Sequence, residues 1–523
     1  MKEKHAMQRR EFLAALGAAG AGMFSLPAAG EEPPPASAPS DDPLGSAAPR
    51  DIFVGVHLAA HSLYDEGFDH CLDFLQNTAT VNTLLVTSNS YYGAMVRPKE
   101  VQGDHGVPIR DGRERRLTPI WFKPREKHYA QTKLRHRPPG ADDEYAGREV
   151  FADLAEPARR RGMKVHERLY EPGGPAIRNR IDHGETVLTI DVFGEPGNRP
   201  CWNNPDYVEF VAAWVRDLFE QYPLDGIQYG AERSGPLSRL IDWPAAVPTC
   251  FCDHCRRRAD AEGVDFDRAR EGLTKVCRFV QALERGEEAG PDGALVGFLR
   301  LLMDYPEIFA WEAMHYRAGE RLHRRIRDTI KQANPKAFVG RHIDHSQCSW
   351  DVFFRAAMPY SAMIAASEYL KLSTYHDILG PRLRQQIVER YGKHILREII
   401  PNNLLALFYA VTGHDPGREP PFDALDDRGL SPEYVHREVR RAVESVAGKA
   451  AIFAGIAIDI PRGSGWGAEP WPSDPEVVYR CVRRAFDGGA AGIVVCREYE
   501  EMRAPSLRAI GRAVRDHALA ARV

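Results

Sequence analysis

The run Leu224-Asp225-Gly226-Ile227-Gln228-Tyr229-Gly230-Ala231-Glu232-Arg233 contains a short β-rich segment that ends in charged side chains. Seven other runs of this kind occur along the 523-residue chain, and amphipathic helical stretches separate most of them. This alternation predicts a parallel sheet wound with helices. The predicted strands are residues 52–57, 82–87, 163–167, 226–229, 337–341, 363–367, 452–458 and 492–496.

Eight strands are the number that closes a (β/α)8 TIM barrel, which is an α/β fold. The spacing of apolar residues predicts helices over residues 205–221 and 475–486, and a long helix within residues 298–330. The main competing fold is a doubly wound open sheet, which typically carries a Gly-rich phosphate loop after its first strand. No such loop follows residues 52–57, so the barrel is the prediction.

We expect the barrel to occupy residues 51–523 as one catalytic domain with two long insertions. Residues 92–147, after the second strand, are rich in Arg, Lys, Pro and Gly. Residues 233–335, after the fourth strand, hold a cysteine cluster followed by helices. Long loops at the catalytic face of a barrel commonly shape substrate specificity, and we expect this of both insertions.

Residues 1–30 differ in character from the rest of the chain. Arg9 and Arg10 precede an apolar run over residues 14–26, an arrangement that resembles a twin-arginine export signal. The run is too short and too rich in Ala and Gly for a stable membrane span. Residues 31–50, rich in Pro, Ala and Ser, are expected to form a flexible linker. An export signal places the mature protein in the periplasm or outside the cell; the alternative is a disordered tail with a chance arginine pair.

The composition argues against some classes of partner. The formal net charge is -4 and the pI is about 6.6, whereas nucleic acids and anionic membranes favour a basic protein face. Hydrophobic residues make up 43% of the chain and charged residues 27%, which is ordinary for a globular enzyme with a large core. We therefore expect no nucleic-acid or membrane partner, and the sequence leaves the oligomeric state open.

Cys250, Cys252 and Cys255 form a Cys-x-Cys-x-x-Cys cluster, which brings three thiolates within reach of one tetrahedral Zn2+. Cys201 or His254 could complete the coordination. A closed site of this kind stabilises a loop and leaves no open position for catalysis, so no catalytic cofactor is implied. Disulfides are the alternative in an exported protein, and reduced free thiols are a third possibility.

Four motifs occur in order along the chain: Cys201-Trp202-Asn203-Asn204-Pro205-Asp206-Tyr207, the run from Leu224 to Arg233, Cys250-Phe251-Cys252-Asp253-His254-Cys255, and Gly492-Ile493-Val494-Val495-Cys496-Arg497-Glu498-Tyr499. Together they resemble glycoside-hydrolase-like barrel proteins and the clan A glycoside hydrolases. The resemblance is greatest to the β-galactosidases that carry a Cys-x-Cys-x-x-Cys cluster after the fourth strand. It spans most of residues 51–515 as short motifs, and it implies an enzyme that cleaves glycosidic bonds in a carbohydrate.

The resemblance also implies roles for two carboxylates. In clan A a general acid/base Glu ends the fourth strand and a nucleophilic Glu ends the seventh, and Glu232 and Asp459 occupy these positions. Ala231 stands where the clan has Asn, and Asp459 is one methylene short, which moves its carboxylate by more than about 1 Å. Glycosidic cleavage needs two carboxyl groups, so Glu368 and Glu498 are alternatives for the second. Glu232 could instead pair with a nearby Arg, and Asp459 could cap a turn.

Other polar or aromatic residues near strand ends are expected to face the barrel mouth and contact substrate. These candidates are His57, Glu167, Tyr229, Arg233, His342, Asp344, Tyr369, Trp466 and Arg497. His342 and Asp344 alternate along the fifth strand, so both could face the mouth while His345 points elsewhere. For each of these residues, a packing or surface role is the alternative.

Three functional hypotheses follow, of which glycoside hydrolysis is preferred. The second is a barrel that binds glycans without cleaving them, supported by the departures at Ala231 and Asp459. The third is a metal-dependent hydrolase or lyase in which His342 and Asp344 hold a catalytic cation. The sequence shows no Ser nucleophile motif and no H-E-x-x-H zinc motif, which disfavours other hydrolase classes.

Overall fold

The computed structural model of the chain describes residues 52–91, 95–96, 101–108, 114–243, 246–461 and 470–521. The predicted export signal, the predicted linker up to residue 50 and Trp466 lie outside the described residues. In the described part, none of the helices is long and apolar enough to cross a membrane.

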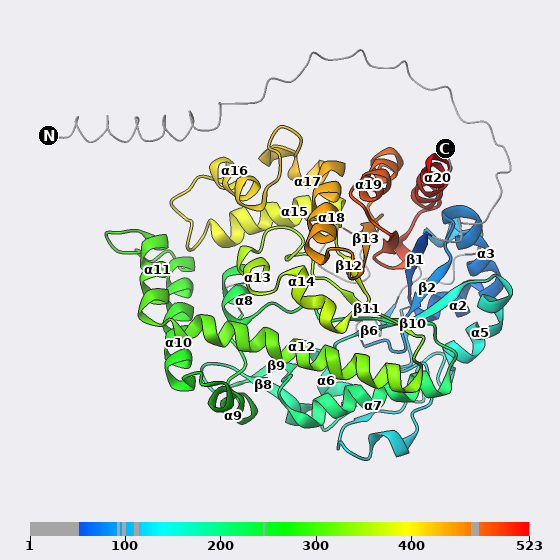
Figure 1. The fold of residues 1–523 in the computed structure, drawn as a ribbon, viewed down its shortest axis with the longest axis horizontal. Coiled ribbons are helices and arrows are strands. Elements are labelled where there is room, and N and C mark those ends of the chain that lie inside the picture. Colours follow the sequence, from blue (N-terminus) through cyan, green and yellow to red (C-terminus); the bar gives the residue numbers. More distant parts are fainter. Residues whose placement is uncertain are drawn as a thin grey trace, which may run out of the picture. The chain divides into compact units, whose positions relative to one another are not determined.

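Eight parallel strands close into a barrel, which confirms the predicted (β/α)8 fold and excludes the doubly wound sheet (Figure 1). In chain order the strands are β1 (Phe53–Leu58), β2 (Thr83–Val86), β6 (Lys164–Tyr170), β10 (Gly226–Gly230), β11 (Phe338–His342), β12 (Tyr369–Leu372), β13 (Ala451–Ala457) and β14 (Gly492–Cys496). Each strand pairs with the next in this order, and β14 closes the barrel against β1 with Gly492 opposite Phe53.

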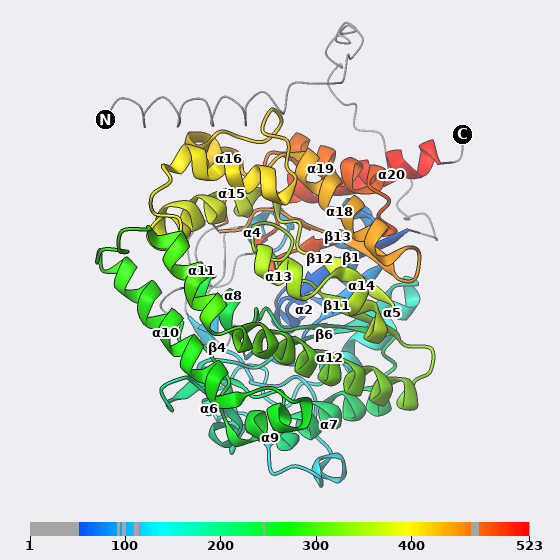
Figure 2. The ribbon, with the colours of Figure 1, turned by 60° about the vertical axis from the view of Figure 1, so that its left-hand side comes forward.

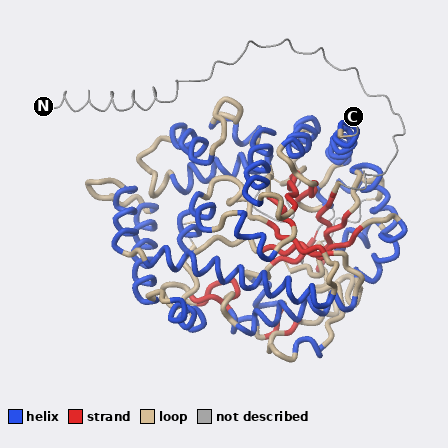
Figure 3. The backbone as a smooth tube through the Cα atoms, in the orientation of Figure 1, coloured by secondary structure: helices blue, strands red, loops and turns tan. Residues whose placement is uncertain are grey.

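Helices surround the strands, as Figure 3 shows in blue around red. The main ones are α3 (Phe68–Ala79), α5 (Val150–Arg160), α7 (Pro205–Gln221), α12 (Glu307–Ala333), α18 (Pro432–Val446), α19 (Pro475–Asp487) and α20 (Ala504–Ala520). α7 has the predicted bounds because Asn204 accepts a hydrogen bond from the Asp206 N–H at its N-terminus and Pro205 occupies its first turn. α19 extends one residue beyond its prediction.

Aromatic rings fill the N-terminal end of the barrel interior. Phe453 stacks on Phe53 with ring centroids 4.1 Å apart, and Tyr369 packs against Phe338 and Phe453 at 4.8 and 4.9 Å. Gly340 makes room for this layer, since a Cβ there would lie 1.9 Å from the Tyr369 ring. Side chains alternate along a strand, so every second residue beyond this layer also points inward, toward the C-terminal mouth.

The sixth strand was predicted in the wrong place. Residues 363–367 belong to the end of α14 (Tyr360–Met363), the turn η3 (Ile364–Ala366) and the residue that follows, whereas the strand is β12. β12 reads Tyr-Leu-Lys-Leu and all four residues are buried. Lys371 interrupts the apolar pattern of this strand, so the more apolar stretch upstream looked like the better strand.

The single long helix predicted within residues 298–330 is also wrong, because two helices occupy this segment. α11 (Ala294–Asp304) ends before Tyr305, and α12 begins after Pro306. A residue before proline is disfavoured in the helical conformation, and Tyr305 is non-helical, with φ -130° and ψ 65°. α10 (Phe266–Glu284) packs against both helices (Figure 2).

Elaborate connections follow four strands. The segment from β2 to β6 contains β3 (Met95–Val96), β4 (Arg115–Arg116) and β5 (Arg135–His136), and the segment from β10 to β11 contains the cysteine cluster and α10 to α12. The sequence did not predict two further elaborations. After β6 come β8 (Leu188–Ile190) and β9 (Pro196–Pro200), and after β12 come α15 (His376–Gln385) and α16 (Pro401–Thr412).

Candidate active site at the barrel mouth

Polar side chains replace apolar ones in the C-terminal half of the barrel interior. The inward-facing residues there are His57, Arg168, Tyr170, Gln228, His342, Lys371 and Cys496. Gly455 faces this region too, because a Cβ on it would lie 2.8 Å from the Lys371 ammonium. Active sites of TIM barrels lie at this end, where the loops after the strands converge.

Glu232 lies just beyond β10 at the mouth, as predicted. Its side chain is 42% exposed, and its Oε1 lies 2.9 Å from Nε2 of the buried His342. Desolvation acts to raise the pKa of Glu232, but the hydrogen bond and charge interaction with His342 hold that pKa below its usual range. Burial and the neighbouring Lys371 lower the pKa of His342 to about 4, so the ring is neutral at pH 7. Glu232 is therefore a carboxylate whose Oε1 lies beside a neutral imidazole.

Glu498 follows β14 and also belongs to the mouth. Its Oε1 accepts a hydrogen bond from Arg168 at 2.6 Å, and both side chains are only 5% exposed. Its Oε2 is buried with no hydrogen-bond partner among the described residues. Burial raises the pKa of Glu498, although the charge of Arg168 acts in the opposite direction. Glu498 thus differs from Glu232 in the sign of its pKa shift.

Asp459 occupies the position predicted for the nucleophile, but its carboxylate is already fully engaged. Oδ1 accepts hydrogen bonds from the Ser473 N–H at 2.9 Å and the Ser506 hydroxyl at 3.0 Å, and Oδ2 accepts one from the Arg503 N–H at 2.7 Å. The residue is buried. These contacts tie the loop after β13 to the start of α20, which is the turn-stabilising role weighed as the alternative.

Glu368 is at the other end of the barrel. It precedes β12, accepts a hydrogen bond from the Val339 N–H at 2.9 Å and pairs with Lys331 at 2.9 Å. The prediction that it follows a strand was wrong because the sixth strand was misplaced. Glu368 therefore lies away from the mouth and is not available as the second carboxylate of this site.

Three predicted substrate contacts face elsewhere. Tyr229 points out of the barrel and packs on His323 of α12 with ring centroids 4.8 Å apart. Tyr369 belongs to the aromatic layer at the opposite end, where its hydroxyl donates to the Ile227 carbonyl at 2.9 Å. Glu167 has the opposite orientation to its inward-facing neighbour Arg168, and accepts a hydrogen bond from the Ser88 hydroxyl at 2.8 Å.

The remaining candidates lie at or near the mouth. His57 faces the interior, with its Nε2 3.0 Å from the Gln228 amide nitrogen. Arg233 donates to Glu171 at 2.9 Å, and Arg497 donates to Glu501 at 3.0 Å. Both arginines therefore have carboxylate partners within the protein.

Asp344 lies beyond the end of β11 at His342, so the predicted alternation does not reach it. Its Oδ1 accepts hydrogen bonds from the N–H and hydroxyl of Ser346 at 2.7 and 2.9 Å. His345, expected to point elsewhere, is close enough to Glu232 to help lower the pKa of that carboxyl. The fifth strand therefore brings His342 to the site, and the loop after it adds His345.

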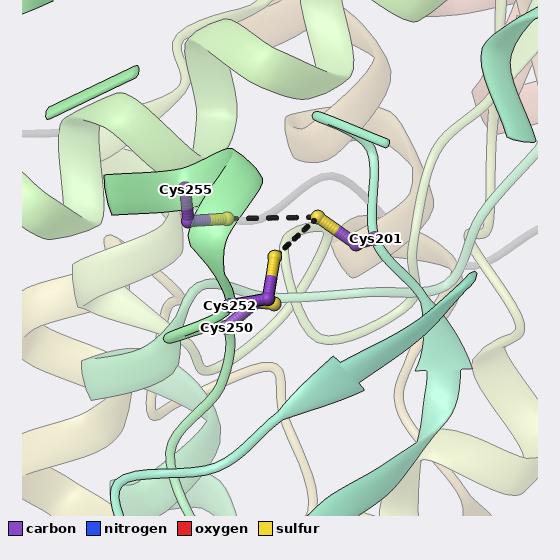
Figure 4. Close-up of side chains that lie close together, drawn as sticks. All are labelled: Cys201, Cys250, Cys252 and Cys255. Carbon is purple, nitrogen blue, oxygen red and sulfur yellow. Dashed lines mark hydrogen bonds between the residues drawn. The ribbon is translucent and has the colours of Figure 1, made fainter. Parts of the chain in front are cut away.

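Four cysteines converge on one point (Figure 4): Cys201 from the loop before α7, Cys250 and Cys252 from the loop before α9 (Asp253–Glu262), and Cys255 from the first turn of α9. Their sulfur atoms all lie within 4.8 Å of one another, and the Sγ of Cys201 is 3.5 Å from those of Cys252 and Cys255. Four thiolates around Zn2+ at about 2.3 Å stand roughly 3.8 Å apart, so the donor set fits a structural zinc.

Neighbouring groups also suit thiolate ligands. The Ile190 N–H lies 3.4 Å from the Cys250 Sγ, and the Asn203 amide lies 3.4 Å from the Cys255 Sγ. His254 is not part of the cluster, because its ring contacts Arg257. Cys201 is therefore the fourth member, and none of these four cysteines forms a disulfide bond in this structure.

A catalytic cation at His342 and Asp344 finds little support in the geometry. Among the described residues, the four cysteines form the only group of three or more His, Cys, Asp or Glu side chains with ligand atoms this close together. Nε2 of His342 already contacts Glu232, and Asp344 is engaged by Ser346.

Four further residues at the mouth were not predicted from the sequence: Arg168, Tyr170, Lys371 and Tyr375. Tyr170 places its hydroxyl 3.3 Å from His342 Nδ1, and Lys371 Nζ lies 3.4 Å from the same atom. Tyr375 contacts Lys371 Nζ at 2.5 Å. The sequence offered one indication of these residues, namely a charged side chain within each of two strands, Arg168 in β6 and Lys371 in β12. Charged side chains are almost never fully buried unless they are paired.

No family model and no curated protein matches the sequence. Solved structures with similar folds include a β-galactosidase from Halorubrum lacusprofundi, at 12% identity, with 89% of this chain and 58% of that chain covered and a TM-score of 0.49. A β-galactosidase from Marinomonas ef1 has 10% identity, coverage of 90% and 60%, and a TM-score of 0.48. An α-L-fucosidase from Paenibacillus thiaminolyticus has 14% identity, coverage of 89% and 49%, and a TM-score of 0.44. The chain thus spans about half to three fifths of these proteins, and the similarity concerns the fold alone.

Proposed function

We propose that this protein is a glycoside hydrolase whose reacting carboxyl groups are Glu232 and Glu498. The observation that carries the proposal is that two carboxyl groups lie at the mouth in different surroundings. Glu232 is 42% exposed and lies 2.9 Å from His342, whereas Glu498 is 5% exposed and pairs with Arg168 at 2.6 Å. These surroundings shift their pKa values in opposite directions, downward for Glu232 and upward for Glu498. When the pKa values of two carboxyls differ in this way, one can act as the acid and the other as the base. Glycosidic cleavage requires that division.

The roles that we propose for these two carboxyls differ from the expectation taken from clan A. Glu232 remains ionised, which suits a nucleophile or a base that activates water. Glu498 more readily holds a proton, and its Oε2 is free to donate that proton to the leaving glycosidic oxygen. A separation of about 5 Å between the two carboxyls corresponds to retention of configuration, and one of roughly 6.5–9.5 Å corresponds to inversion.

Activity on chromogenic glycosides and polysaccharides tests the proposal, with the purified protein beside its Glu232→Gln and Glu498→Gln variants. The matched control is Glu368→Gln, which changes a carboxylate at the other end of the barrel. A carboxylate base is lost as pH falls, so the contacting pair of Glu232 and His342 should together set the acidic limb of the kcat/KM profile. A proton donor is lost as pH rises, so Glu498 should set the basic limb. Turnover that survives both substitutions would contradict the proposal, and glycan binding without turnover would favour a binding barrel.

We also propose that Cys201, Cys250, Cys252 and Cys255 hold one structural zinc ion. The four-sulfur geometry supports this, and metal analysis of the purified protein should return one zinc per chain. Oxidation to disulfides would instead leave the protein metal-free and lower the count of titratable thiols.

Export through the twin-arginine pathway is a further proposal, and it rests on the sequence of residues 1–30. A reporter fused to residues 1–50 should reach the periplasm, and the change of Arg9 and Arg10 to Lys should keep it in the cytoplasm. Equal export of both fusions would contradict this proposal.

A further inference from the structure

Lys371 is buried in the barrel interior, and no carboxylate among the described residues serves as its counter-ion. Its residue exposure is 0%, and among the described residues no carboxylate oxygen lies within 4.0 Å of its ammonium. Burial of a charge without an oppositely charged partner is unfavourable, and an apolar side chain of similar volume would avoid that cost. The presence of a lysine at this buried position is therefore better explained by a function than by packing.

The Cys496 side chain lies beside the ammonium as one hydrogen-bond partner. Three oxygen or nitrogen acceptors also surround the ammonium, which has three N–H donors to share among these groups. They are the Tyr375 hydroxyl oxygen at 2.5 Å, His342 Nδ1 at 3.4 Å and the Ser373 hydroxyl oxygen at 3.5 Å. Ser373 acts here as an acceptor, because its own proton is donated to the Ile343 carbonyl at 2.6 Å. Lys371 and His342 are also direct partners in the register of β11 and β12, so the backbone holds the two side chains together.

The contacts of His342 then settle which ring nitrogen carries its proton. Nδ1 faces two donors, the Lys371 ammonium and the Tyr170 hydroxyl at 3.3 Å. Nε2 faces two acceptors, Glu232 Oε1 at 2.9 Å and the Ser373 oxygen at 3.4 Å. An ammonium has no lone pair to accept with, so Nδ1 must be the acceptor and Nε2 the donor.

We propose that Lys371 is a positioning residue: by donating to Nδ1 of His342, it fixes the tautomer in which Nε2–H donates to Glu232 and keeps Glu232 a carboxylate. With the other tautomer, the Nε2 lone pair would face the carboxylate and favour its protonation. This inference deepens the proposed function and rests on it for its catalytic meaning, but the tautomer itself can be measured without any reaction.

Other charged and titratable groups also act on this pair. Around His342 they are Arg168 and Tyr170 on β6, His57 on β1, and Glu232 after β10. Around Glu232 they are His345 after β11 and Arg382 on α15, and around Lys371 they are Cys496 on β14 and Arg168. Among the groups that act on His342, Lys371 makes the largest charge contribution, and it lowers the pKa of the ring.

The test is NMR of protein labelled with 15N-histidine, in which two-bond 1H–15N correlations report the tautomer and titration of each ring. His342→Gln identifies the signal of His342. We expect a neutral ring protonated at Nε2 at pH 7. In Lys371→Met, loss of the neighbouring cation should raise the pKa of His342 by about 1 unit or more. Lys331→Met, which removes a lysine at the other end of the barrel, should leave His342 unchanged.

A ring protonated at Nδ1, or an imidazolium at pH 7, would overturn the inference. So would an unchanged His342 titration in a folded Lys371→Met protein. If the Met variant does not fold, Lys371→Arg can be measured in its place. This variant keeps a donor cation at position 371, so it should preserve the wild-type tautomer of His342.

Kinetics separate this inference from the proposed function. In an active enzyme, Lys371→Met should lower kcat and move the acidic limb of the pH profile to higher pH, with little change in KM. His342→Gln places an amide near Nε2 and should retain more activity than His342→Asn, whose amide lies near Nδ1. If the protein hydrolyses no glycoside but the NMR result is as expected, the tautomer assignment stands and the proposed function fails.

Discussion

The buried pair between Arg168 and Glu498 allows a quantitative prediction. Both side chains are 5% exposed and their N–O distance is 2.6 Å, so neither group can exchange its partner for water without local opening. The perturbation is Arg168→Met, which removes the cation while keeping much of the side-chain volume. Removal of one partner of a buried pair typically costs about 3–5 kcal/mol, because the other charge is left uncompensated.

That cost should depend on pH, with a sign that follows from the surroundings of Glu498. Without Arg168, the remaining influences on the pKa of Glu498 are burial, Glu500 and Glu501, and all of them raise it. A carboxyl with a raised pKa in the folded state is protonated there at a pH where it is ionised in the unfolded chain. The folded variant therefore loses stability as pH rises above about 4.3, by about 1.4 kcal/mol for each unit of pKa elevation.

Urea unfolding at pH 5 and pH 8 measures the effect in the wild type, in Arg168→Met and in Arg168→Met combined with Glu498→Gln. We expect the single variant to be destabilised more at pH 8 than at pH 5. The double variant should recover much of the loss at pH 8, because its side chain at position 498 is neutral. Equal destabilisation at both pH values, or a double variant no more stable than the single one, would refute this reasoning.

Two further predictions concern the fold. Gly340→Ala places a Cβ 1.9 Å from the Tyr369 ring, so it should lower the free energy of unfolding by about 1–3 kcal/mol or more. Tyr369→Leu in the same chain should recover part of that loss, and urea unfolding midpoints of both variants would check this. If the cysteine cluster holds the proposed zinc, Cys255→Ser should lower the zinc content and the thermal midpoint. Cys481→Ser, at a buried cysteine outside the cluster, should leave the zinc content unchanged.

Much of the barrel could be predicted because parallel strands buried on both faces read as short apolar runs. The exception was β12, in which Lys371 breaks the run, and this error also misplaced Glu368. Side-chain direction was harder to predict than strand position. Tyr229 was predicted to face the mouth, but its neighbour Gln228 is the residue that faces the barrel interior. Successive side chains of a strand point to opposite sides of the sheet, so an error of one residue reverses the predicted direction.

The candidate site was predicted only in part for a related reason. Glu232 and His342 were identified because they end strands, which is a local property of the sequence. The Arg168–Glu498 pair joins residues 330 positions apart, and the contact between Lys371 and His342 depends on the register of neighbouring strands. Neither follows from residue spacing. The role of Asp459 was likewise hidden, since its hydrogen-bond donors come from Ser473, Arg503 and Ser506.

The ratio of kcat/KM between the wild type and Glu232→Gln, on the best glycoside found in the panel, tests whether Glu232 is a reacting carboxyl of a glycoside hydrolase. We expect a fall of about 100-fold or more, the scale of one lost acid–base or nucleophilic group, with Glu368→Gln close to the wild type. Turnover that is unchanged in Glu232→Gln, or that falls equally in Glu368→Gln, would contradict it.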